Sequence, residues 1–190
     1  HGSMLASGSD DKTTILWDAN TGKRLRTLDG FARDIFALKF SNDGSILWTG
    51  SSDLIAWEIA TGKTVSTIQL GSLSLGSIDI SPDGTTVVVS SLNEDKTMTA
   101  RIFDIRTGKL LRSFGGKDFG VYQVCFLSNG KHLAGTTYNR TDGPSLQVWD
   151  TASGKVQKRF PSEFKEIWSI DLSPKGNLIA TGGEGPGVEI

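Results

Sequence analysis

The sequence predicts an all-β fold built from a repeated four-stranded antiparallel sheet. Three observations support this prediction: a Gly-Lys turn that returns four times, a second turn at a constant distance from each, and short apolar runs between these turns. The 190 residues include 23 Gly and only 5 Pro, a composition typical of short strands joined by tight turns. Since no window has a sustained helical period, we expect almost no helix.

The two turn signals fix the length of the repeat. The first signal occurs at Thr21-Gly22-Lys23, Thr61-Gly62-Lys63, Thr107-Gly108-Lys109 and Ser153-Gly154-Lys155. The second follows 22 positions later in every copy, at Gly44, Gly84, Gly130 and Gly176. Successive first turns are 40 or 46 positions apart. A repeat this regular predicts an array of similar units, and most recurring residues then serve the repeat rather than a chemistry.

Residues 35–68 show the elements of one repeat in order. Residues 35–40 form a short apolar run that stops at the turn around Gly44, and residues 45–50 form the next strand. Asp53 marks a tight reversal, after which residues 54–57 lead to the turn at Gly62. Residues 64–68 alternate polar and apolar, as an exposed edge strand does. The repeat is therefore predicted to be a four-stranded antiparallel meander.

The repeats differ in length between their second and third strands. Gly44 and Trp57 are 13 positions apart, whereas Gly84 to Phe103 and Gly130 to Trp149 are each 19. We expect the extra residues to form loops near 93–96 and 138–143. Such insertions on a repeat scaffold often lie on its binding face.

An aromatic-acidic pair precedes each Gly-Lys turn, at Trp17-Asp18, Trp57-Glu58, Phe103-Asp104 and Trp149-Asp150. Together with residues 5–18, this pattern resembles the WD40-repeat family, whose repeats each form one blade of a β-propeller. The resemblance covers residues 5–190 and implies about four and a half blades. Their expected boundaries are 5–30, 31–70, 71–116, 117–162 and 163–190.

The family's Gly-His pair is missing from every repeat, and its first position holds Gly30-Phe31. The resemblance implies a hydrogen-bond network that joins Trp17, Ser7 and Asp11, without the histidine. We expect apolar packing between blades to take over, because each lost buried hydrogen bond removes on the order of 1 kcal/mol.

Both ends of the chain match the same strands of the repeat. Residues 5–9 match a second strand, and residues 188–190 match the start of a third. We expect residues 1–4 to be an expression-tag remnant. The expected fold is thus a partial or open propeller, its faces covered by self-association or by the remaining blades of a longer chain.

Residues typical of catalytic and metal-binding sites are scarce. His132 is the only histidine outside the expected tag and Cys125 the only cysteine, so neither a histidine-activated nucleophile nor a zinc site is predicted. Aspartates beside turn glycines are expected to cap their own backbone. We therefore expect no enzyme activity, no cofactor and no metal. The single cysteine favours a reducing, cytoplasmic location. The net charge of −1 and the lack of a long apolar run argue against nucleic-acid and membrane partners.

The candidate binding residues lie where the innermost strand of each blade begins. Phe36, Gly76, Tyr122 and Trp168 occupy equivalent positions there. The resemblance places these positions at the rim of the central channel, on a face that family members use for partner recognition. The predicted site, for a protein or peptide partner, consists of Asp34, Phe36, Tyr122, Glu166 and Trp168. Simple packing around the channel mouth is the alternative for these aromatics.

The function predicted from these observations is a non-catalytic scaffold for protein–protein interaction. The alternative is a regulatory or sensory repeat module of a larger multidomain enzyme.

Overall fold

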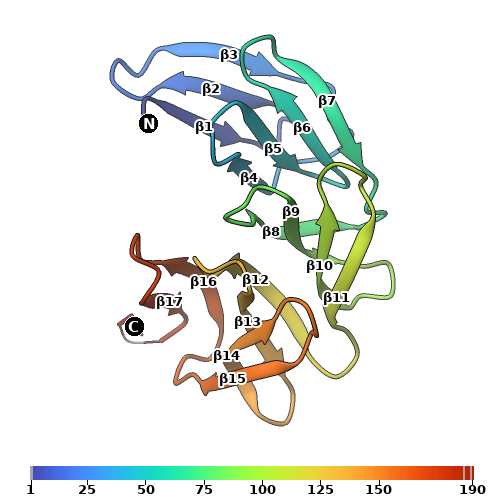
Figure 1. Ribbon diagram of the computed structural model, residues 1–190, viewed down its shortest axis with the longest axis vertical. Helices are drawn as coiled ribbons and strands as arrows, with labels where there is room; N and C mark the ends of the chain where they lie inside the picture. The colour runs from blue at the N-terminus through green and yellow to red at the C-terminus, as the bar shows by residue number, and fades with distance from the viewer. Residues whose placement is uncertain (1, 186, 189) are drawn as a thin grey trace. The chain divides into compact units, whose positions relative to one another are not determined.

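The computed structural model describes residues 2–185, 187–188 and 190. These residues form seventeen strands, and no helix occurs among them (Figure 1). The strands pair into antiparallel sheets of three, four, four, four and two strands. The predicted all-β fold of four-stranded antiparallel blades is therefore confirmed, with about four and a half blades present.

The chain divides into two compact units, residues 1–75 and 76–190. The first unit contains two sheets. The three-stranded sheet consists of β1 (Met4–Gly8), β2 (Thr14–Asp18) and β3 (Arg24–Leu28). The four-stranded sheet consists of β4 (Ala37–Phe40), β5 (Ile46–Gly50), β6 (Leu54–Glu58) and β7 (Lys63–Ile68).

The second unit begins within β8 and contains the other sheets. One consists of β8 (Ser74–Ile80), β9 (Thr86–Leu92), β10 (Met98–Asp104) and β11 (Leu110–Gly115). The next consists of β12 (Gly120–Phe126), β13 (His132–Asn139), β14 (Gly143–Asp150) and β15 (Val156–Pro161). The last pairs β16 (Ile167–Leu172) with β17 (Ile179–Gly183).

The eight repeat glycines all adopt a left-handed backbone conformation. Their φ angles lie between 65° and 74°, at Gly22, Gly44, Gly62, Gly84, Gly108, Gly130, Gly154 and Gly176. Glycine reaches this region without the steric cost that a Cβ atom imposes. The regular spacing in the sequence is thus the spacing of left-handed turns between strands.

The acidic residue of each aromatic-acidic pair holds the Gly-Lys turn that follows. The backbone pattern is the same in every repeat, as in the first, where the Gly22 amide donates to the Asp18 carbonyl at 2.8 Å. The side chain adds a second bond. The Asp18 carboxylate accepts the Thr21 amide at 2.8 Å, and Asp104 and Asp150 each accept the equivalent amide at 2.7 Å. The pair therefore fixes the hairpin between the third and fourth strands of each blade.

Neighbouring blades within a unit are joined by an arginine that reaches the next Gly-Lys turn. Arg26 on β3 donates to the Thr61 carbonyl at 3.0 Å and to the Ala60 carbonyl at 3.2 Å. Arg112 on β11 makes the equivalent bonds to the carbonyls of Ser153 and Ala152. The turns at Gly62 and Gly154 thus close their own hairpins and also accept hydrogen bonds from an arginine of the preceding blade.

The expected Trp network is only partly present. Trp17 Nε1 donates to Ser7 Oγ at 2.9 Å, as predicted. Asp11, however, does not join that pair, because its carboxylate accepts both the amide and the hydroxyl of Thr13 at 2.9 and 2.7 Å. In the second blade Trp57 Nε1 makes the equivalent bond to Thr49 Oγ1 at 3.0 Å.

Aromatic packing occupies the place of the missing histidine. Phe31, which stands in the histidine position, is 7% exposed and its ring centroid lies 5.2 Å from that of Trp57. In the second unit Phe114 and Phe119 lie against Trp149, with centroids 5.6 and 6.5 Å away. Apolar packing is therefore found at both tryptophans, and at Trp57 it adds to the bond with Thr49.

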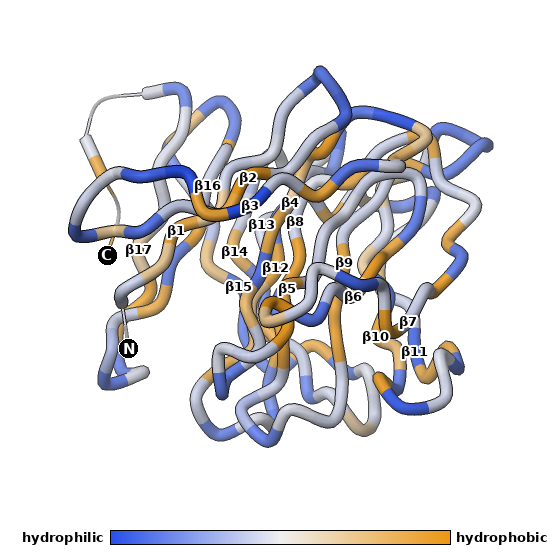
Figure 2. Tube along the Cα trace, turned by 90° about the horizontal axis from the view of Figure 1, so that it is seen from above, coloured by the Kyte–Doolittle hydropathy of each residue, from blue (hydrophilic) through white to orange (hydrophobic). Residues whose placement is uncertain are grey.

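Each unit has its own hydrophobic core between blades. The first core is built around Leu16, Leu28, Leu47 and Trp57, and the second around Val88, Val121, Leu133 and Trp149. Figure 2 shows the underlying pattern, with hydrophobic segments mainly along the strands and hydrophilic segments mainly in the turns. The outermost strand β15 is exposed along its whole length, as expected of an edge strand.

Three expectations about individual elements need correction. The extra residues of the longer repeats mostly lengthen strands: β5 and β6 have five residues each, β9 and β10 seven, and β13 and β14 eight. Their alternating side chains continue the ladder, so the hairpins project further. The loop expected near 93–96 is present at residues 93–97, whereas the loop expected at 138–143 is reduced to residues 140–142. The strand expected at residue 35 begins instead at Ala37. The strand expected at 188–190 includes Glu189, which lies outside the described residues, and neither Val188 nor Ile190 is in a strand.

Gly44 and Gly62 have the same φ of +72°, but only Gly62 lies beside Arg26. Replacing each by alanine therefore separates the cost of backbone strain from the cost of losing the Arg26 bonds between blades. In Gly44→Ala the new Cβ meets nothing within 4 Å, so we expect a loss of about 1–2 kcal/mol from the left-handed conformation alone. In Gly62→Ala the Cβ would lie 2.7 Å from Arg26 Cδ. Displacing that arginine should remove roughly 1 kcal/mol more. Urea unfolding measures both, and equal losses would contradict the joining role of Arg26.

The turn aspartates predict a loss of stability in acid. The Ser41 hydroxyl, followed by the amide and hydroxyl of Ser45, lowers the pKa of Asp43 to about 2. A lowered folded-state pKa stabilises the fold above the unfolded pKa, near 3.9, and this contribution is lost as pH falls toward 2. The free energy of unfolding measured from pH 6 to pH 2 should therefore fall across this window. Asp43→Asn should make the fall shallower, and an unchanged slope would contradict the assignment.

Candidate functional site

Tyr122 and Trp168 both stand at β-bulges in the innermost strands of their blades. Between β12 and β13, Val121 pairs with Thr137 and Gln123 with Thr136, so Tyr122 is the extra residue. Between β16 and β17, Ile167 pairs with Gly183 and Ser169 with Gly182, which makes Trp168 the extra residue. A bulge redirects the side chain of the unpaired residue away from the regular alternation. Both aromatics are consequently exposed, Tyr122 at 39% and Trp168 at 60%.

These two aromatics line a pocket of about 270 Å³ in the second unit. Tyr138, 41% exposed near the end of β13, supplies a third aromatic side chain. Glu166 is the charged residue of the lining, and its carboxylate accepts a hydrogen bond from Trp168 Nε1 at 3.1 Å. The other lining residues are uncharged: Thr136, Thr137, Pro144 and Ile167. The pocket therefore combines aromatic surface with a single carboxylate.

The surroundings of Tyr122 favour its protonated form. Partial burial, and then the negative charge of Glu166, raise the pKa of the Tyr122 phenol. The ring also lies close to Gly120, where an added Cβ would be 3.0 Å from a ring carbon. The glycine at this position therefore leaves room for the ring, whereas the equivalent position in the next blade holds Glu166.

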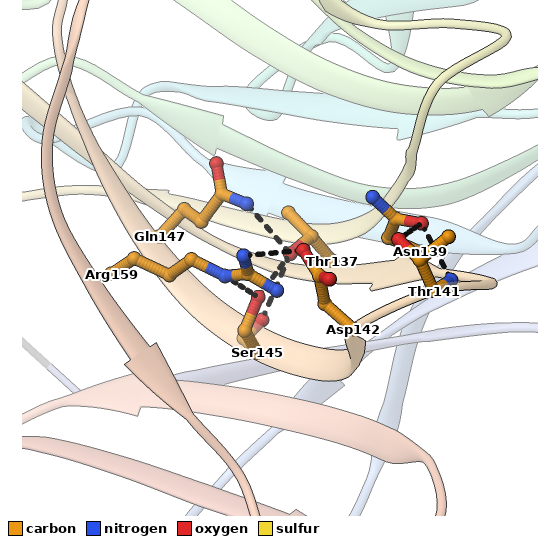
Figure 3. A network of polar contacts seen from close by, with 7 residues as sticks. All are labelled: Thr137, Asn139, Thr141, Asp142, Ser145, Gln147 and Arg159. Atoms are coloured by element: carbon orange, nitrogen blue, oxygen red, sulfur yellow. Dashed lines mark hydrogen bonds and ion pairs between the residues drawn. The ribbon is translucent and has the colours of Figure 1, made fainter.

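A polar network supports the hairpin that forms one wall of the pocket (Figure 3). The buried Thr137 Oγ1 lies 2.8 Å from Ser145 Oγ and accepts the Gln147 side-chain amide at 3.3 Å. Arg159 on β15 donates to Ser145 Oγ at 3.2 Å and forms an ion pair with Asp142 at 2.7 Å. These bonds tie the long β13–β14 hairpin to the outermost strand and hold the wall in place.

Gly76 is the equivalent position in the third blade, and it has no aromatic because the backbone of the next strand approaches too closely. A Cβ on Gly76 would lie 2.5 Å from the Tyr122 carbonyl oxygen and 2.7 Å from Ser90 Oγ. The Gln123 side chain also donates to the Gly76 carbonyl at 3.2 Å. Here the strands of adjacent blades are joined directly, so no pocket of the same kind can form.

The structure brings together three of the five predicted partner-binding residues. Tyr122, Glu166 and Trp168 line one pocket. Asp34 and Phe36 belong to the first unit, where Phe36 is 47% exposed and Asp34 is partly buried. Sequence reasoning missed Tyr138 and Pro144 as lining residues. The greater length of this repeat was the signal that could have found them, because both lie on its extended hairpin.

Among the described residues, no group of three or more His, Cys, Asp or Glu side chains is placed to hold a metal ion. The part of the chain that the structure describes also has no helix of the length and apolar character needed to span a bilayer.

The sheets define the chain as a repeat protein of the β-propeller class. The family model described as "WD domain, G-beta repeat" matches residues 1–18, 108–150 and 154–185. The chain belongs to the WD40-repeat family.

Curated relatives share this repeat at low identity. Autophagy-related protein 16 of Arabidopsis thaliana is 25% identical over 187 residues, which cover 94% of this chain and 34% of that protein. The guanine nucleotide-binding protein subunit beta of A. thaliana is 29% identical, covering 94% and 50%. COMPASS component SWD3 of Saccharomyces cerevisiae is 28% identical, covering 84% and 51%. The chain thus spans about a third to a half of the length of these relatives.

A solved structure supports the fold. Kuenenia stuttgartiensis hydrazine synthase superposes with a TM-score of 0.82 at 23% identity, over 95% of this chain and 52% of that one. At this identity the similarity concerns the fold alone.

The electrostatics of the pocket can be tested by titrating Tyr122. The chain has two tyrosines, so Tyr138→Phe leaves Tyr122 as the only phenol. We expect it to titrate above its ordinary value of about 10 in an ultraviolet absorbance titration. Adding Glu166→Gln should lower this pKa part of the way, since burial is the larger cause. The control is Asp171→Asn, which removes an exposed carboxylate of β16 that lies outside the pocket. If Glu166→Gln leaves the midpoint of the Tyr122 titration unchanged, the proposed effect of Glu166 on the phenol is wrong.

Proposed function

We propose that this chain is a non-catalytic scaffold for protein–protein interaction that binds a peptide segment of its partner in the pocket of Tyr122, Tyr138, Glu166 and Trp168. The observation that supports this proposal most directly is the exposure of three aromatic side chains around one pocket. Aromatic side chains placed on rigid strands give binding energy at a low entropic cost, which makes them common anchors of interfaces.

The relatives favour an interaction role. The names "COMPASS component" and "guanine nucleotide-binding protein subunit beta" describe parts of larger assemblies. A repeat scaffold with one cysteine and two histidines suits such a role better than a reaction.

Several finer points belong to the same proposal. We infer a cytoplasmic location from the single cysteine. From the near-neutral charge we infer a protein or peptide partner, not a nucleic acid or a membrane. Asp34 and Phe36 are proposed to contact the partner from the first unit. The alternative of a regulatory module in a larger enzyme is tested by the length and neighbouring domains of the full gene product.

Selection from a random peptide library displayed on phage tests the site. We expect the immobilised chain to enrich peptides whose binding falls about tenfold or more in Trp168→Ala, in keeping with a loss of more than about 1 kcal/mol at an interface anchor. The matched control is Phe160→Ala, which removes a comparably exposed aromatic from β15, outside this pocket. If every enriched peptide binds wild type and Trp168→Ala equally, the proposed site is wrong.

A further inference from the structure

We infer that the pocket of Tyr122, Tyr138, Glu166 and Trp168 takes a positively charged side chain, lysine or arginine, from the bound peptide. The inference rests on the proposed function, because it names the chemistry of the anchor that this site would recognise.

The first argument is the charge of the lining. Of the eight residues around the pocket, Glu166 is the only acidic residue, and none is basic. The neighbouring Lys165 does not neutralise it, since its ammonium forms an ion pair with Glu184 at 3.0 Å. Glu166 Oε2 accepts the Trp168 indole N–H at 3.1 Å, and among the described residues no hydrogen bond to Oε1 is found. The pocket therefore offers a carboxylate oxygen to an incoming donor.

The second argument is the aromatic surface. The electron-rich faces of Trp and Tyr attract cations, and the attraction grows when the cation is partly removed from water. Trp168, Tyr138 and Tyr122 are all exposed, at 60%, 41% and 39%. Because partial burial and Glu166 keep the Tyr122 phenol protonated, this ring brings no second negative charge. Aromatic surface beside one carboxylate is complementary to an ammonium or guanidinium group on an apolar stem.

The third argument excludes the other classes of anchor. An acidic side chain would be repelled by Glu166. An apolar side chain would cover the carboxylate without giving it a partner, and an ionised group that loses water without gaining a hydrogen bond is costly. A basic side chain supplies that partner, and the pocket of about 270 Å³ is smaller than typical drug-sized sites, as befits a single side chain.

Degenerate peptide pools can test this assignment directly. Four biotinylated pools share random flanks of four residues and differ in the central residue: lysine, arginine, norleucine or glutamate. Norleucine keeps the apolar stem of lysine and removes its charge. We expect the 190-residue chain to retain the lysine or arginine pool about two- to fivefold better than the norleucine pool, and the glutamate pool least. This preference should weaken with added salt.

Two variants show whether the preference comes from the pocket. Glu166→Gln should remove most of the lysine-over-norleucine preference, while Asp171→Asn, on the adjoining strand β16 but outside the pocket, should leave it intact. Tyr138→Ala should weaken the basic pools, whereas Tyr138→Phe, which keeps the ring, should not.

The outcomes separate the two proposals. If all pools bind equally but lose binding in Trp168→Ala, the pocket binds peptides without reading charge, and the basic-anchor inference is overturned alone. If wild type and Glu166→Gln prefer the basic pools equally, the positive charge of the peptide is recognised outside this pocket, and the inference is again overturned. If no pool and no library peptide depends on Trp168, the proposed function fails with it.

Discussion

The hydrogen bonds between each acidic residue of the aromatic-acidic pairs and the following Gly-Lys turn are the constraint on which the blades depend. The turn needs a left-handed glycine, and the acidic residue secures it through its backbone and, in three repeats, through a carboxylate that accepts an amide. The same four hairpins contain a β-bulge at the aromatic of the pair. Fixing the turn therefore also fixes the register in which that aromatic enters the core. The carbonyls that the turn leaves exposed then receive Arg26 or Arg112 from the preceding blade.

Packing between blades replaces the polar network that the family resemblance led us to expect. Where a hydroxyl is present, at Ser7 and Thr49, the tryptophan indole is satisfied. In the fourth blade the equivalent position is Gly135, whose Cβ would lie 3.0 Å from Trp149. That tryptophan is held by the rings of Phe114 and Phe119 instead. The same aromatic is thus stabilised by a hydrogen bond at Trp17, by neighbouring rings at Trp149 and by both at Trp57.

The sequence was sufficient for the fold because turns with constant spacing leave few other arrangements for the strands between them. It also located Tyr122, Glu166 and Trp168, since equivalent positions in a repeat lie at equivalent places in each blade. It did not supply the bulges at Tyr122 and Trp168, because an extra residue only shifts the phase of the alternation, and strands of six or seven residues are too short to fix that phase from the sequence. Nor did the pattern distinguish a longer loop from a longer hairpin, and for this reason Tyr138 was missed as a wall of the pocket.

The innermost strands explain why one junction between blades has a pocket and another does not. At the junction of the third and fourth blades, Gly76 lets the Tyr122 carbonyl approach, and the Asp79 carboxylate accepts the Phe126 amide at 2.7 Å. Polar bonds join the two strands there along their length. At the junction of the fourth and fifth blades the equivalent of Gly76 is Tyr122 itself, and its side chain stands where a closer approach would be needed. A pocket lies at this junction, and Tyr122, Trp168 and Glu166 line it. Glycine at this repeat position thus accompanies a closed junction and an aromatic accompanies a pocket, while both blades remain four-stranded.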